Sequence, residues 1–319
     1  MLSRVADSLY WMSRYLERAA HTSRVIDVDL QLRLDQSPEV VREHWERLLE
    51  SLHVPVAGST ALNSVTVAHA LAFDRLNPSS IISCISAARE NLRHVREQCS
   101  SEMWEHLNRL YLRINGNPPS EAWILHSNLF FRSVQEGANL FEGITDCTMS
   151  HGEGWHYIQL GRFVERTDAV AALVGSYFTR LPRAMDQAAE SEEYLEWVGL
   201  LKCCTAFEAY CKVYTAEVRP LRVAEFLLLN SEFPHSVRFS VDMIHSALRT
   251  IGELTERKAD RPMRLAGRLK AALSFSQIEE IFAGSAVDYV NSVRSQCALA
   301  HDSIHQIYFD YPIASATVV

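Results

Sequence analysis

The sequence predicts an all-α fold: a multi-helix bundle formed by two degenerate internal repeats that are related by pseudo-two-fold symmetry. Apolar residues recur at intervals of three and four over long stretches, which is typical of helices with one buried face. The 319 residues include only 12 glycines and 10 prolines, too few for the frequent turns of a sheet protein. A short charged motif also occurs twice. We therefore expect one helical domain over residues 1–319, with repeats at about 1–150 and 151–310.

The first half of the chain reads as a series of helices separated by proline and glycine. The apolar stripe from Leu2 through Leu9 to Leu16 predicts a first helix that continues to about Leu34. Asn77-Pro78-Ser79-Ser80 is typical of a helix start, because hydroxyl side chains can accept hydrogen bonds from free N–H groups. The other helices predicted in this half cover residues 38–52, 63–76, 81–95, 103–114 and 120–148.

The second half follows after the loop at residues 151–154. Its predicted helices cover residues 155–178, 190–217, 220–229, 234–256, 262–275 and 276–309. The tail from Tyr311 to Val319 is expected to be irregular, and no stretch alternates polar and apolar residues over the length of a strand.

Three pairs of segments occur in the same order in both halves. They are Arg14–Arg18 with Arg162–Arg166, then Trp45, Leu48 and Leu49 with Trp197, Leu200 and Leu201, then Pro78, Ser80 and Ile81 with Pro234, Ser236 and Val237. One such match would be chance. Three collinear matches predict a duplication whose two units bury their apolar faces on each other.

The repeated motif carries the candidate site residues. They are Arg14, Glu17, Arg18 and His21 in the first copy and Arg162, Glu165, Arg166 and Asp168 in the second. The spacing of the first four places them on one helix face. Two interpretations stay open. The pairs are structural ion pairs, worth about 0.2–0.5 kcal/mol each if exposed, or both Glu–Arg pairs meet in a buried network that orients a carboxylate or phosphate ligand.

Other kinds of site have little support in the sequence. A net charge of −8 and the absence of a basic run argue against nucleic-acid binding. No phosphate-binding loop or dinucleotide fingerprint occurs, and no GxSxG turn surrounds Ser133 to make it a hydrolase partner of His126. His301 and His305 have the spacing of metal ligands but lack the glutamate of the HExxH motif. We expect no metal and no cofactor.

The chain is expected to lie in the cytoplasm. Arg4, Asp7 and Arg14 interrupt any apolar signal segment, and no stretch reaches 18 apolar residues, so no contact with a membrane is expected. The seven cysteines include no CxxC pair and favour reduced thiols.

Several segments together resemble the bacterial alpha-E family, an all-helical domain named for its Glu-Arg motif. They are Arg14–Arg18, Ser86–Asn108, Phe141–Asp146 with Thr148 and Met149, Arg162–Arg166 and Pro234–Val237. The resemblance covers nearly the whole chain and carries the motif over to Glu17, Arg18, Glu165 and Arg166. One departure is His235, at a position where the family pattern leads us to expect arginine.

The resemblance implies two partners, a circularly permuted ATP-grasp protein and a transglutaminase-like peptidase, in systems that make or modify peptides by ATP-dependent amide-bond formation. We expect a non-catalytic accessory subunit that binds the ligase or its peptide substrate. The alternative is an enzyme with a site between the repeats, where Glu17 or Glu165 acts as general acid or base and Arg18 or Arg166 holds a carboxylate of a peptide or amino acid.

Overall fold

The all-α fold is confirmed by a computed structural model, which describes residues 1–32, 38–52, 54, 63–115, 127–179, 191–255 and 260–310. Within these ranges the regular structure is helical, with no strand. None of the described helices combines the length and the apolar character needed to cross a bilayer. The expected irregular tail, residues 311–319, lies outside the described residues.

The helices of the first half end close to the predicted boundaries. They are α1 (Ser3–Leu32), α2 (Pro38–Ser51), α3 (Ser64–Phe73), α4 (Ile81–His94), α5 (Ser101–Asn115) and α6 (Ser127–Thr148). The predicted start of α4 is confirmed, because the Ser80 hydroxyl accepts a hydrogen bond from the Ser83 amide at 3.3 Å. The first residues of the predicted helix 120–148 lie outside the described ranges.

The second half contains more breaks than the sequence predicts. Its helices are α7 (Glu153–Phe178), α8 (Ser191–Cys203), α9 (Phe207–Tyr214), α10 (Pro220–Leu229), α11 (Val237–Thr255), α12 (Asp260–Phe275), α13 (Ile278–Ala283) and α14 (Ala286–Ile304), followed by a π-helical turn at His305–Phe309.

Two long predicted helices are wrong as single elements. The prediction for 190–217 is divided into α8 and α9 at Thr205, whose φ of 52° cannot continue a right-handed helix. The prediction for 276–309 is divided at Gly284 and Ser285. The Ser285 hydroxyl accepts a hydrogen bond from the Asp288 amide at 3.2 Å and starts α14 there.

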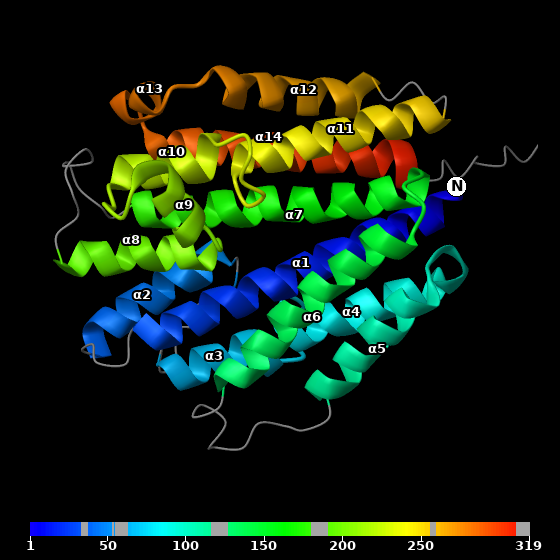
Figure 1. Ribbon diagram of the computed structural model, residues 1–319, viewed down its shortest axis with the longest axis horizontal. Coiled ribbons are helices and arrows are strands. Elements are labelled where there is room, and N and C mark those ends of the chain that lie inside the picture. The colour runs from blue at the N-terminus through cyan, green and yellow to red at the C-terminus, as the bar shows by residue number, and fades with distance from the viewer. Residues whose placement is uncertain are drawn as a thin grey trace, which may run out of the picture.

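The long helices α1 and α7 lie at the centre and pack against each other (Figure 1). Helices α4 and α6 pack on α1, and α5 packs outside them. On the other side α11 and α14 pack on α7, and α12 covers these two. Besides the α1–α7 contact, α8 packs on α1 and α2 packs on α7 across the two halves. The central pair therefore has helices on both sides, which explains why so many of its residues are buried.

The two central helices approach so closely that only glycine fits at position 161. A Cβ atom built on Gly161 would lie 2.2 Å from the carbonyl oxygen of Tyr10 and 2.3 Å from the Ser13 hydroxyl. Backbone atoms of α1 cannot move aside without disturbing the helix. This contact fixes the point along their axes at which α1 and α7 cross, immediately before the charged motif of each helix.

Candidate functional site

The charged motifs of α1 and α7 pair with each other across the helix crossing. Arg14 donates from Nε to Glu165 Oε2 at 2.8 Å, and Arg18 donates from Nε to Glu165 Oε1 at 2.5 Å. In the opposite direction, Arg166 donates from Nε and Nη2 to the two oxygens of Glu17 at 2.8 and 2.7 Å. Each carboxylate is thus held by guanidinium groups of the other helix, in the short geometry of charge-assisted hydrogen bonds.

The cluster around Glu17 is sealed from solvent. The side chains of Glu17 and Arg166 are only 3% and 6% exposed. Arg24 Nη2 lies 3.9 Å from Glu17 Oε1, and Arg166 also donates to the Pro234 carbonyl at 3.2 Å. The cavity that Glu17 lines, between α1, α6 and α7, measures only about 20 Å³. We name these residues the sealed cluster, and such a small space leaves no room for a ligand.

Both motif carboxylates are ionised at neutral pH. Burial alone would raise the pKa of Glu17, but the charge and hydrogen bonds of Arg166 outweigh burial and hold this pKa below its ordinary value. Burial also acts to raise the pKa of Glu165, and Arg14 and Arg18 reverse it in the same way. Burial lowers the pKa of His21 to about 4, and the nearby Arg24 adds to this effect, so His21 is neutral beside the sealed cluster.

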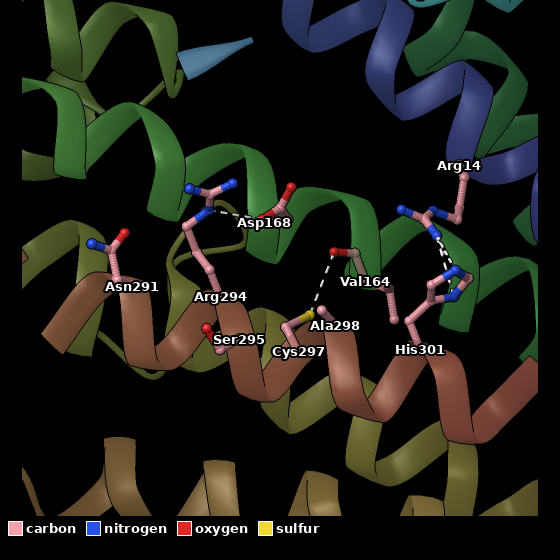
Figure 2. A pocket seen from close by; sticks show the side chains of 9 residues that line it. All are labelled: Arg14, Val164, Asp168, Asn291, Arg294, Ser295, Cys297, Ala298 and His301. Atoms are coloured by element: carbon pink, nitrogen blue, oxygen red, sulfur yellow. Dashed lines mark hydrogen bonds and ion pairs between the residues drawn. The ribbon is translucent and has the colours of Figure 1, made fainter. Parts of the chain in front are cut away.

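The cluster around Glu165 borders open space instead. A groove of about 450 Å³ lies between α7 and α14, with Arg14 of α1 at one end (Figure 2). We call it the α14 groove. It is lined by Arg14, Val164, Asp168, Asn291, Arg294, Ser295, Cys297, Ala298 and His301. A second cavity of about 200 Å³ lies beside Arg18, Glu165 and Asp168, between α1, α7 and the region of Leu52 and Leu71.

His301 forms one wall of the α14 groove. Its Nδ1 lies 2.8 Å from the Tyr10 hydroxyl, and the Arg14 guanidinium lies 3.2 Å from its Nε2. Burial and the charge of Arg14 lower the pKa of His301 to about 4, so the ring is neutral at pH 7. His305 lies 3.4 Å from Asp7. The described residues contain no group of three side chains suited to a metal, and the Arg14 cation beside His301 would oppose one.

The remaining predicted site residues lie at the edges of these clusters. Arg162 Nη1 pairs with Glu142 Oε2 at 2.8 Å. Asp168 accepts a hydrogen bond from Arg294 Nε at 2.9 Å, so the second motif extends to α14. The Ser133 hydroxyl accepts a hydrogen bond from Arg113 at an exposed position, and its possible partner His126 lies outside the described residues.

Sequence reasoning missed three contributors. Arg24 continues the charged stripe of α1 one turn beyond His21, so helical periodicity could have found it. Glu142 lies within a segment that carries the family resemblance, but nothing in its spacing indicates contact with Arg162 and Arg166. Arg294 has no sequence signal, because tertiary packing alone brings α14 to α7.

These features define a class: an all-helical domain whose two central helices are joined by reciprocal Glu–Arg ion pairs. The family whose profile matches residues 1–309 is Alpha-E, described as a predicted alpha-helical domain with a conserved ER motif. The chain belongs to the Alpha-E family, and the resemblance noted in the sequence is confirmed.

The curated relatives are mycobacterial. Uncharacterized proteins from Mycobacterium bovis and Mycobacterium tuberculosis are 22% identical to the chain over 304 residues, which cover 87% of it. The chain spans only about a third (33%) of the length of these relatives. No solved structure matches the chain.

Proposed function

We propose that this protein is a non-catalytic helical subunit of an ATP-grasp amidoligase system that makes or modifies a peptide. The observation that carries the proposal is the pairing of both motif carboxylates, Glu17 and Glu165, with guanidinium groups of the opposite helix. Because these charged residues hold α1 against α7, they are not available for catalysis. This arrangement suits a binding subunit whose partner carries out the reaction.

The enzyme alternative has less support. A general acid or base works best when its pKa lies near the working pH, whereas the pKa values of Glu17 and Glu165 are both lowered and their oxygens are already engaged. In the α14 groove, burial raises the pKa of the Cys297 thiol to about 12, with a further contribution from Asp168. A thiol of that pKa is not a nucleophile at neutral pH.

The family resemblance names the partners, a circularly permuted ATP-grasp protein and a transglutaminase-like peptidase. In the mycobacterial relatives the matching region occupies about a third (33%) of a longer chain, which supports a unit that works beside other domains. We place the protein in the cytoplasm, where the proposed ligase has ATP and where seven free cysteines stay reduced.

The proposal includes an internal duplication with pseudo-two-fold symmetry, with repeats at about 1–150 and 151–310. Four observations support it. The ion pairs between α1 and α7 are reciprocal, α8 packs on α1 as α2 packs on α7, and the matched Trp45 and Trp197 are both fully buried. Ser80 and Ser236, another matched pair, both accept hydrogen bonds from the amide three residues later.

Reconstitution tests the proposed role. The purified chain is mixed with the proposed partner, a circularly permuted ATP-grasp protein, with and without ATP and a candidate peptide. We expect a stable complex at micromolar concentration, with ATP and peptide consumed only when the ligase is present. Complex formation is followed by size-exclusion chromatography, and the fate of ATP and peptide by mass spectrometry.

A matched variant separates the two roles of Glu165. Glu165→Gln keeps the shape of the side chain but removes its negative charge, so a subunit role predicts lower thermal stability and retained product formation at a temperature where the variant is folded. Loss of product in a folded, ligase-bound variant would favour the enzyme. Failure to form any complex under all of these conditions would overturn the subunit role.

A further inference from the structure

The α14 groove has the geometry of a binding site, and we propose that it takes the carboxylate end of a short peptide, with Arg14 holding the carboxylate. Many carboxylates have a similar shape, and the choice of a peptide among them rests on the proposed function. The carboxylate itself is argued from the groove alone.

Arg14 lies at one end of the groove, and not all of its N–H donors are used by Glu165. Its side chain is only 11% exposed and its Nε is bound to Glu165. Its Nη1 faces the His301 ring and the guanidinium also interacts with the Tyr10 hydroxyl, while among the described residues the one carboxylate hydrogen-bonded to Arg14 is that of Glu165, through Nε. The Trp11 ring lies under the guanidinium carbon at 4.7 Å and holds the group in place. Figure 2 shows the guanidinium reaching from α1 over His301 into the space between α7 and α14.

The corresponding arginine of the second motif pairs with a carboxylate outside the two motifs, whereas the one carboxylate bound to Arg14 is the motif residue Glu165. Arg162 occupies in α7 the place that Arg14 occupies in α1, and it pairs with Glu142 of α6 at 2.8 Å. Around Arg162 the cavity is about 20 Å³. Beside Arg14 the neighbouring helix offers neutral His301 instead, and about 450 Å³ of open groove. A ligand carboxylate would therefore take the role that Glu142 takes at the other arginine.

The charge balance of the region favours one negative charge. Among the side chains that line the groove, Arg14 and Arg294 are cationic, Asp168 is anionic and His301 is neutral, so the lining carries one excess positive charge. An excess charge at a poorly solvated site is stabilised by a bound anion. Arginine binds carboxylates through paired parallel N–H groups, which fits the remaining donors of Arg14.

The length of the groove suits a short extended chain. Arg294 precedes His301 by seven residues, which is roughly 10 Å along a helix. That distance matches about three extended residues. Asn291 and Ser295 lie on the same face of α14 and offer side-chain hydrogen bonds to a peptide backbone. A volume of about 450 Å³ lies within the usual range for ligand pockets.

Equilibrium dialysis of the purified full chain tests this site without the ligase. The probe is a mixture of N-acetylated tripeptides with free C-terminal carboxylates, compared with the same mixture as C-terminal amides, and bound species are identified by mass spectrometry. We expect free acids to be retained, and amides without an acidic side chain to bind at least about tenfold more weakly. Retention of amides that carry Asp or Glu would identify a side-chain carboxylate as the bound group and still support the site.

Two neighbouring positions on α14 give a matched pair of variants. Ala298→Glu places a bulky negative charge in the groove, whereas Leu299→Glu makes the same change at a side chain that is 50% exposed and lies outside the groove lining. We expect at least about tenfold weaker retention for Ala298→Glu and unchanged retention for Leu299→Glu, with both variants folded by circular dichroism.

Three results would overturn the inference. They are equal retention of acids and amides, equal retention by both variants, or retention of inorganic phosphate with no tripeptide. Because the dialysis uses the chain alone, its failure would leave complex formation with the ligase unaffected, and a failed complex would leave tripeptide binding unaffected.

Discussion

The two Glu–Arg clusters use the same residue types on the same pair of helices, yet their surroundings differ. Glu17 lies with Arg166 and Arg24 in a sealed interior, whereas Glu165 lies with Arg14 and Arg18 beside open cavities. The comparison teaches that the same ion pairs can have two roles. The sealed cluster holds α1 against α7, and the cluster around Glu165 does the same while Arg14 also directs hydrogen-bond donors toward the α14 groove. The predictions below test that division.

The largest effect is expected on removing the sealed carboxylate. Glu17→Ala leaves Arg166 and Arg24 buried without their main counter-ion, and we expect the free energy of unfolding to fall by about 3–5 kcal/mol. Glu165→Ala should cost less, about 1–3 kcal/mol, because the Arg18 side chain is 26% exposed and water can solvate it. Urea denaturation of both variants measures the difference.

The test is whether Glu17→Ala lowers the free energy of unfolding more than Glu165→Ala does. Equal costs, or a larger cost for Glu165→Ala, would mean that the open cluster is as important for folding as the sealed one, and the division between them would fail.

The next largest effect on stability is expected where α1 and α7 approach most closely, at Gly161. Gly161→Ala forces a methyl group against the Tyr10 carbonyl and should destabilise the fold by about 1–3 kcal/mol or more, because backbone atoms cannot yield. Gly252→Ala in α11 is the matched control, since nothing lies within 4 Å of its Cβ position. Alanine there should stabilise the helix by about 0.5–1 kcal/mol. Thermal melting of the pair compares them, and two similar melting temperatures would contradict the tight crossing.

The free energy of unfolding should depend on pH through His21, which is buried beside the sealed cluster. Histidine in the unfolded chain gains a proton near pH 6.5, whereas burial holds the pKa of His21 at about 4 in the folded protein. The unfolded state therefore binds more protons between these values, and stability falls as the pH is lowered from about 6.5 to about 4, by at most about 1.4 kcal/mol per pH unit for this group.

His21→Gln should flatten that slope. Urea midpoints measured from pH 7 to pH 4.5 provide the comparison with the unsubstituted chain, and identical slopes would show that His21 is not held neutral by its surroundings.

The smallest effect is expected at the rim of the α14 groove. Arg294→Gln breaks a pair with Asp168 in which both side chains are partly exposed, and exposed pairs contribute about 0–1 kcal/mol. We expect a stability change below about 1 kcal/mol, together with weaker retention of free-acid tripeptides. A loss of several kcal/mol would mean that the open cluster is structural throughout.

Local patterns predicted most of the helices. The apolar stripe of α1 and the hydroxyl start of α4 are properties of short segments, and the structure has both where expected. The breaks at Thr205 and Ser285 were missed, because each depends on how the following helix packs and no proline marks it. The shared face of Arg14, Glu17 and Arg18 followed from spacing. Tertiary packing decides two further features that spacing does not predict. These residues pair with the other motif and not within their own helix, and α14 forms a groove beside one cluster.

The reciprocal pairing of α1 and α7 has a consequence for synthesis on the ribosome. Arg18 precedes its partner Glu165 by 147 residues, and at about 5–20 residues per second the wait between them is roughly 7–30 s. During that interval α1 can already pack on α4 and α6, but its arginines and Glu17 still lack their partners on α7. We therefore expect these charges to favour solubility of the unfinished chain before they join the two central helices.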